Sequence, residues 1–239
     1  MLEAAFWGLV TASSLWVGAA LAAFVRLSER VIGLAMAFGA GALIAAVAYE
    51  LVIDAFATDL ALASIGFACG GVTFYLGDLM VDRMGGEGRK SMAGQAQLAG
   101  ASGAIVMGTV LDGIPESFVL GSSLVEEGVV PLAVVVGVFV SNVPEALSGT
   151  AGLLSAGWER SRVFKMWSGV VAASVVATVA GWYLIESVGN AGGAFVTAFA
   201  AGALLVMLAD TLMPEAFDLG GREAGLFTAL GFAVGFGLS

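Results

Sequence analysis

Two proline-glutamate sequences in consecutive apolar segments are the part of this chain best suited to chemistry. One reads TVLDGIPESFVLG and carries Asp112 and Glu116; the other reads VFVSNVPEALSG and carries Ser141, Asn142 and Glu145. A charged group at mid-membrane costs on the order of 2.5–3.5 kcal/mol on insertion scales, so it usually belongs to a pathway or a site. Each proline also removes a backbone donor and loosens a helical carbonyl, which adds an oxygen atom. These groups predict a site for a hard or borderline cation.

Helical spacing puts the candidate ligands on shared faces. Asp112 and Glu116 are four residues apart, as are Ser141 and Glu145, and Asn142 precedes Glu145 by three. We expect antiparallel packing of the two segments to bring these side chains together. No Lys or Arg lies in the interior of an apolar segment, so the carboxylates must hold a cation or carry protons. The alternative is protonated carboxyls hydrogen-bonded between helices, with the prolines as ordinary kinks.

The composition is that of a polytopic membrane protein. The 239 residues are 59% hydrophobic and 12% charged, whereas a soluble domain carries roughly 25% charge. Histidine is absent and Cys69 is the single cysteine, which excludes an intrachain disulfide and a thiolate cluster. A metal site must therefore use oxygen atoms or methionine sulfur. Met36, Met107 and Met207 could offer sulfur, although methionine in an apolar helix more often packs.

Eight apolar segments predict an all-α membrane protein of eight transmembrane helices in one domain, residues 1–239. About 20 residues are needed to cross ~30 Å of hydrocarbon, and only the last segment is clearly shorter. All nine Lys and Arg residues fall on one side, in connections or at a segment end, so that side is expected to be cytoplasmic, with loop 80–97, and both termini outside. The segments are about 4–24, 31–56, 60–79, 98–124, 129–156, 164–185, 194–217 and 224–238.

An internal repeat relates the two ends of the chain. Residues 37–56 align without gaps on 198–217 with ten of twenty positions identical. The predicted topology makes the two copies run in opposite directions across the membrane, so the repeat is inverted. We expect a 3+2+3 arrangement, with helices 1–3 and 6–8 related by the repeat around central helices 4 and 5. Inverted repeats are typical of transporters that bind substrate near mid-membrane.

Two further acids lie on opposite sides of the predicted central site. Glu50 is toward the outer end of the second segment and Asp210 toward the inner end of the seventh. We interpret Glu50 as part of an outer vestibule and Asp210 as part of an exit pathway. Asp54 and Glu215 lie closer to segment ends, where an interfacial position is expected.

The chain resembles the ZIP (Zrt-, Irt-like protein) metal transporters. The resemblance covers nearly the whole chain and is strongest in AGALIAAVAYELVID, DGIPESFVLG, SNVPEALSG and AGALLVMLADTLMPE. In that family helix four typically reads His-Asn-x-Pro-Glu-Gly, and helix five has a similar motif. These motifs supply ligands to a binuclear centre for zinc, iron, manganese or cadmium. The resemblance implies that Glu116 and Glu145 are the two shared glutamates, and that Ser141 and Asn142 occupy the paired ligand positions of helix five.

This sequence departs from the family pattern at three places. Asp112 stands where the helix-four histidine usually is, Gly113 replaces the asparagine, and the sixth segment lacks the glutamate that some members use. The resemblance therefore implies one site rather than two. An oxygen-only ligand set suits Mn²⁺, Fe²⁺ or Mg²⁺ better than Zn²⁺, which prefers nitrogen and sulfur.

Transport of divalent metal cations of the zinc, iron, manganese and cadmium class into the cytoplasm is the leading functional prediction. The alternative is a ZIP-fold protein that has lost metal transport and acts as a sensor, a subunit or a carrier of another solute. An intramembrane enzyme with an acid–base pair of carboxylates is a third reading, but no other catalytic motif accompanies it, so we expect no enzyme. The expected partners are the transported ion and the lipid bilayer of a prokaryotic inner membrane, with no cofactor or nucleic acid. The base rate for such transporters favours a homodimer.

Overall fold

The computed structural model describes residues 1–25, 27–86, 102–126, 128 and 130–239, and this part of the chain is almost entirely helical, without a strand. Residues 87–97 of the predicted loop and 98–101 of the predicted fourth segment lie outside the described residues. The first half contains α1 (Leu2–Phe24), α2 (Glu29–Ala46), η1 (Val47–Val52), α3 (Ile53–Thr58), α4 (Leu60–Val81), η2 (Asp82–Gly86) and α6 (Ser102–Glu126). The second half contains α7 (Leu132–Ser155), α8 (Arg160–Met207), η3 (Leu208–Leu212), α9 (Met213–Gly220), η4 (Gly221–Glu223) and α10 (Ala224–Leu238).

Local sequence signals account for where several helices begin and turn. Ser28 and Asp59 are N-caps whose side chains accept hydrogen bonds from backbone N–H groups three residues on, which satisfies donors that the first helical turn leaves open. Gly189 interrupts α8 with φ 67° and ψ 178°, and Gly221 ends α9 with φ 67°. Only glycine adopts such angles readily. The predicted sixth segment therefore lies before Gly189 in α8, and the seventh begins after it and continues through η3 into α9.

Several helices are long and apolar enough to cross a membrane. Among the described residues there are six such candidates: Leu2–Phe24, Glu29–Thr58, Leu60–Met84, Leu132–Ser155, Arg160–Gly189 and Gly192–Leu238. α6, which carries Asp112 and Glu116, is not one of them, and the 47-residue last candidate turns at Gly221. The chain is thus a helical protein of membrane type, with fewer separate spans by length and composition than the eight predicted.

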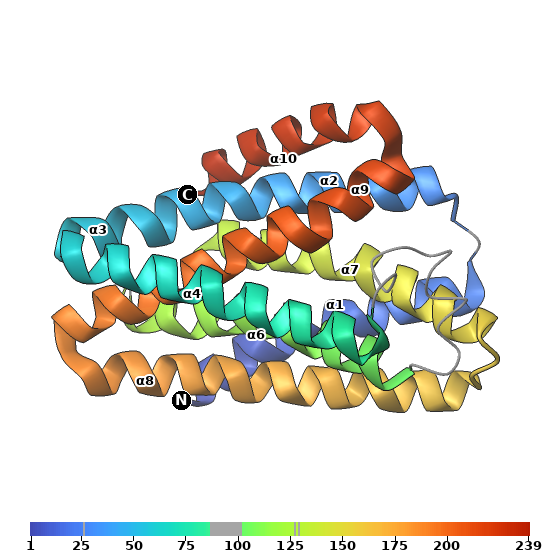
Figure 1. The fold of residues 1–239 in the computed structure, drawn as a ribbon, viewed down its shortest axis with the longest axis horizontal. Helices are drawn as coiled ribbons and strands as arrows, with labels where there is room; N and C mark the ends of the chain where they lie inside the picture. The colour runs from blue at the N-terminus through green and yellow to red at the C-terminus, as the bar shows by residue number, and fades with distance from the viewer. Residues whose placement is uncertain (26, 87–101, 127, 129) are drawn as a thin grey trace.

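Figure 1 shows the helices lying side by side along the long axis of the molecule. The two termini lie toward one end, and the α1–α2, α7–α8 and α9–α10 connections lie toward the other. α6 packs mainly on the first part of α8, and α4 on the part of α8 after Gly189. α7 packs mainly on α1 and α2, and α10 packs on α2.

Close glycine contacts recur at matching positions of the sequence repeat. A Cβ at Gly70 of α4 would overlap the carbonyl oxygen of Phe199 in α8, and a Cβ at Gly231 of α10 would overlap that of Phe38 in α2. Phe38 and Phe199 are equivalent positions of the repeat. Small residues let membrane helices approach closely. The α2–α10 and α4–α8 pairs therefore pack through the same kind of glycine contact with a backbone carbonyl.

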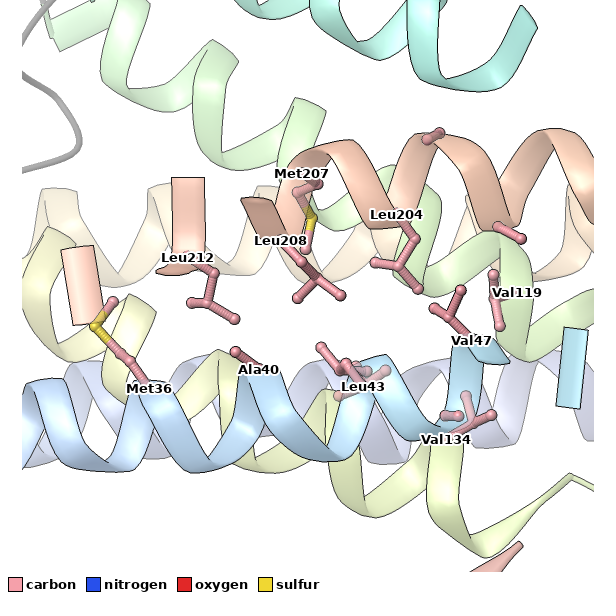
Figure 2. Packing of buried hydrophobic residues seen from close by; sticks show 14 of the residues in the cluster. Met36, Ala40, Leu43, Val47, Val119, Val134, Leu204, Met207, Leu208 and Leu212 are labelled. Atoms are coloured by element: carbon pink, nitrogen blue, oxygen red, sulfur yellow. The ribbon is translucent and has the colours of Figure 1, made fainter. Parts of the chain in front are cut away.

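The largest apolar cluster lies between α2 with η1 and the later part of α8 with η3. Figure 2 shows Leu43 and Val47 on one side of this cluster and Leu204 and Leu208 on the other. Met36 is fully buried and Met207 is 3% exposed, and both belong to the cluster. These two methionines therefore act in packing.

Candidate cation-binding site

The two proline motifs meet through one buried side-chain contact. Pro115 and Pro144 lie inside α6 and α7, which both continue past them. Glu116 of α6 is 2% exposed and Ser141 of α7 is fully buried. The Ser141 hydroxyl lies 3.3 Å from Glu116 Oε1 and 3.0 Å from the carbonyl oxygen of Val138. Because the hydroxyl has one hydrogen, it can donate to only one of these acceptors at a time.

α6 and α7 otherwise touch at few residues, because each packs mainly against other helices. The Glu116–Ser141 contact joins the two motifs across these helices. Asn142 is 6% exposed. Asp112 and Glu145 are half-buried.

The predicted ligands are not gathered into a ready metal cage. Within the described residues, no three His, Cys, Asp or Glu side chains form a group that could hold a metal ion. Ser141 and Asn142 of α7 are buried, as Glu116 is, whereas Asp112 and Glu145 are half-buried. In this conformation the serine and the amide are as much a part of the polar region as the acids are.

A fourth acid, Glu215 of α9, belongs to the same polar region. It is 8% exposed, and Ser148 of α7, itself 1% exposed, donates a 2.7 Å hydrogen bond to its Oε1 atom. Ser141, Glu145 and Ser148 are spaced by four and then three residues, so they share one face of α7. Glu215, which we expected at a membrane interface, is thus buried against α7. Its sequence signal was the third proline-glutamate pair, Pro214–Glu215.

Electrostatic proximity links the acids of α6 and α9. Asp112 lies close enough to interact with both Glu116 and Glu215. Every described Lys and Arg side chain is exposed. Within the described structure, no buried cationic side chain neutralises this group of acids, so bound cations or protons must do so when the acids are desolvated.

The two acids assigned to the pathway lie in unusual backbone. Glu50 is in η1 and Asp210 is in η3, and both elements are single stretches of π-helix. η1 and η3 begin at equivalent positions of the sequence repeat. π-helical turns inside α-helices occur frequently at functional sites. Both acids are half-buried, and the structure does not bring either into contact with Glu116.

No family model matches this chain, and no curated protein matches it at a significant level. The resemblance to the ZIP transporters therefore depends on the quoted motifs alone.

Proposed function

We propose that this chain is a membrane permease that moves divalent metal cations, as the resemblance to the ZIP transporters implies. The observation that supports this most is the pair of buried acids, Glu116 and Glu215, each in contact with a buried serine of α7. Buried carboxyl groups without a buried cationic partner are costly in a membrane protein. A function that uses them, such as binding a dication in transit, gives a reason for their presence.

In this proposal the first ligands of the ion are Asp112, Glu116, Ser141, Asn142 and Glu145. Glu215 adds a carboxyl group on α9, about two helical turns along α7 from Ser141, because Ser148 holds it there. Glu50 serves the outer side of the path and Asp210 the inner side. By the positive-inside rule, the proposal has the α1–α2, α7–α8 and α9–α10 connections in the cytoplasm and both termini outside.

The eight-span arrangement belongs to the same proposal. Splitting α8 at Gly189 and separating α10 at Gly221 yields eight helical stretches in a 3+2+3 order, with α6 and α7 as the central pair. The matching glycine contacts of the α2–α10 and α4–α8 pairs are what an inverted repeat with an axis in the membrane plane produces. Ions would then bind between the repeats.

The chemistry of the ligand set favours harder ions. It contains carboxylate, amide and hydroxyl oxygens and no imidazole, since the chain has no histidine. Mn²⁺, Fe²⁺ and Mg²⁺ accept such ligands well, whereas Zn²⁺ prefers nitrogen and sulfur.

The test is cation flux into proteoliposomes that contain the purified chain, with Zn²⁺, Cd²⁺, Mn²⁺, Fe²⁺, Co²⁺ and Mg²⁺ supplied in turn. Flux of at least one ion that disappears in Glu116→Ala would support the proposal and identify the ion. Cation binding without flux, in protein shown to be folded, would favour the alternative of a ZIP-fold sensor or subunit. If folded protein neither binds nor transports any of these ions, the metal-transport proposal is refuted.

A further inference from the structure

Three methionines line a cavity of about 260 Å³ between α4 and α6. They are Met80 and Met84, from α4 and η2, and Met107 from α6, and the other lining residues are glycine, valine, leucine and isoleucine. Their exposed fractions are 63%, 61% and 51%. Unlike Met36 and Met207, these methionines do not belong to the buried core.

The register of the two helices places the three methionine residues at similar heights along the helix axes. α4 and α6 run in opposite directions (Figure 1), and they approach each other where a Cβ at Gly77 would lie 3.2 Å from Leu111 Cδ1. At 1.5 Å per residue, Met80 lies about 4.5 Å beyond this contact along α4, and Met107 lies about 6 Å from it in the same direction. Met84 is about one turn further, on the same face as Met80. Met107 therefore faces the other two methionines across the cavity, at a height between those of Met80 and Met84.

The chemistry of this set differs from that of the carboxylate site. A thioether is a soft, polarisable and uncharged ligand, and soft sulfur ligands select ions such as Cu⁺. Methionine has three rotatable side-chain bonds, so three of them around one cavity can turn their sulfur atoms toward a common ion. Asp78 and Asp82 lie on the same stretch as the exposed Arg83, so the local charge does not oppose a cation.

We infer that Met80, Met84 and Met107 form a binding site for a soft monovalent cation, Cu⁺ or Ag⁺, separate from the carboxylate site of α6 and α7. Binding at this site requires no deprotonation, because thioethers do not titrate. It also does not depend on the proposed transport of divalent ions.

Ag⁺ is the probe for this site, and the chain allows a clean experiment. The sequence has no histidine, and its one thiol, the exposed Cys69, is removed by Cys69→Ala. The full chain carrying this change is purified in detergent, labelled with ¹³C at the methionine methyl groups, and titrated with Ag⁺. We expect saturable shifts of the Met80, Met84 and Met107 methyl signals, while those of Met36 and Met207 stay in place.

Substitution by leucine then tests the ligands, because Leu and Met have similar volumes and such exchanges usually cost less than about 1.5 kcal/mol. Met107→Leu should weaken Ag⁺ binding by about tenfold or more, which corresponds to about 1.4 kcal/mol. Met207→Leu, in the core, should leave it unchanged. The inference is overturned if Ag⁺ shifts none of the three signals, or if Met107→Leu binds Ag⁺ as well as its parent does.

Discussion

Replacing Glu116 by glutamine removes the charge of the most buried acid and keeps its shape. The carboxyl is 2% exposed and lies against the fully buried Ser141, so water has little room to replace it as a ligand. Removing one partner of a buried charge pair costs about 2–5 kcal/mol. At about 1.4 kcal/mol for each factor of ten, Glu116→Gln should weaken divalent-cation binding by about 30-fold to 4,000-fold.

The same substitution weakens metal binding but should not destabilise the metal-free protein. A carboxylate at mid-membrane costs on the order of 2.5–3.5 kcal/mol on insertion scales, and the neutral amide avoids that cost. Glu116→Gln should therefore unfold at the same temperature as the wild type or at a higher one when no metal is present. The wild type should be stabilised further as metal is added, because the ion binds the folded state, whereas the variant should not.

The assay is thermal unfolding in detergent, with and without added Mn²⁺ or Cd²⁺. Glu3→Gln, which changes an exposed glutamate near the start of α1, is the matched control and should keep the full metal-dependent rise in Tm. A Glu116→Gln variant whose Tm rises with metal as much as that of the wild type would refute the assignment of Glu116 as a ligand.

Three other predictions concern Asp112, Glu215 and the close glycine contacts between helices. Asp112→His should shift the flux preference toward Zn²⁺ in a competition assay, because imidazole is the better zinc ligand; an unchanged metal ranking would remove Asp112 from the ligand set. Glu215→Gln should lower flux in proteoliposomes while the central site still binds metal, and wild-type flux would exclude Glu215 from the path. Gly70→Ala and Gly231→Ala should each destabilise the fold by about 1–3 kcal/mol, because the added Cβ overlaps a carbonyl oxygen of the neighbouring helix. Thermal unfolding measures this, with Gly169→Ala as the control because that Cβ would meet nothing within 4 Å; equal stability of all three would contradict the packing argument.

The apolar segments could be predicted well because length and composition alone determine which stretches favour a membrane helix. The predicted 4–24 and 129–156 correspond to α1 at Leu2–Phe24 and α7 at Leu132–Ser155. The turn at Gly189 lies in the connection predicted between the sixth and seventh segments, which also carries Glu186. The π-helical backbone of η1 and η3 was not predicted, since it depends on the packing of neighbouring helices rather than on local composition.

The sequence predicted which residues belong to the candidate site better than it predicted how they are arranged. The proline-glutamate motifs pointed to Glu116 and Ser141, and the structure brings these two into contact. Glu215 was missed because its distance from the segment end suggested an interfacial position. Its burial comes from the contact with Ser148 on α7, 67 residues away in the chain, and no local pattern contains that information. The third proline-glutamate pair was the one available signal.

The central claim is that the acids of the two proline-glutamate motifs, on α6 and α7, hold the transported ion. Crystals of the purified chain grown with Mn²⁺ or Cd²⁺ test it directly, because anomalous scattering locates the metal. The account predicts a peak within coordination distance of Glu116 and at least one of Asp112, Asn142 and Glu145, and its loss in Glu116→Gln. A saturating metal that lies only at surface carboxylates, with the space around Glu116 empty, would contradict the account.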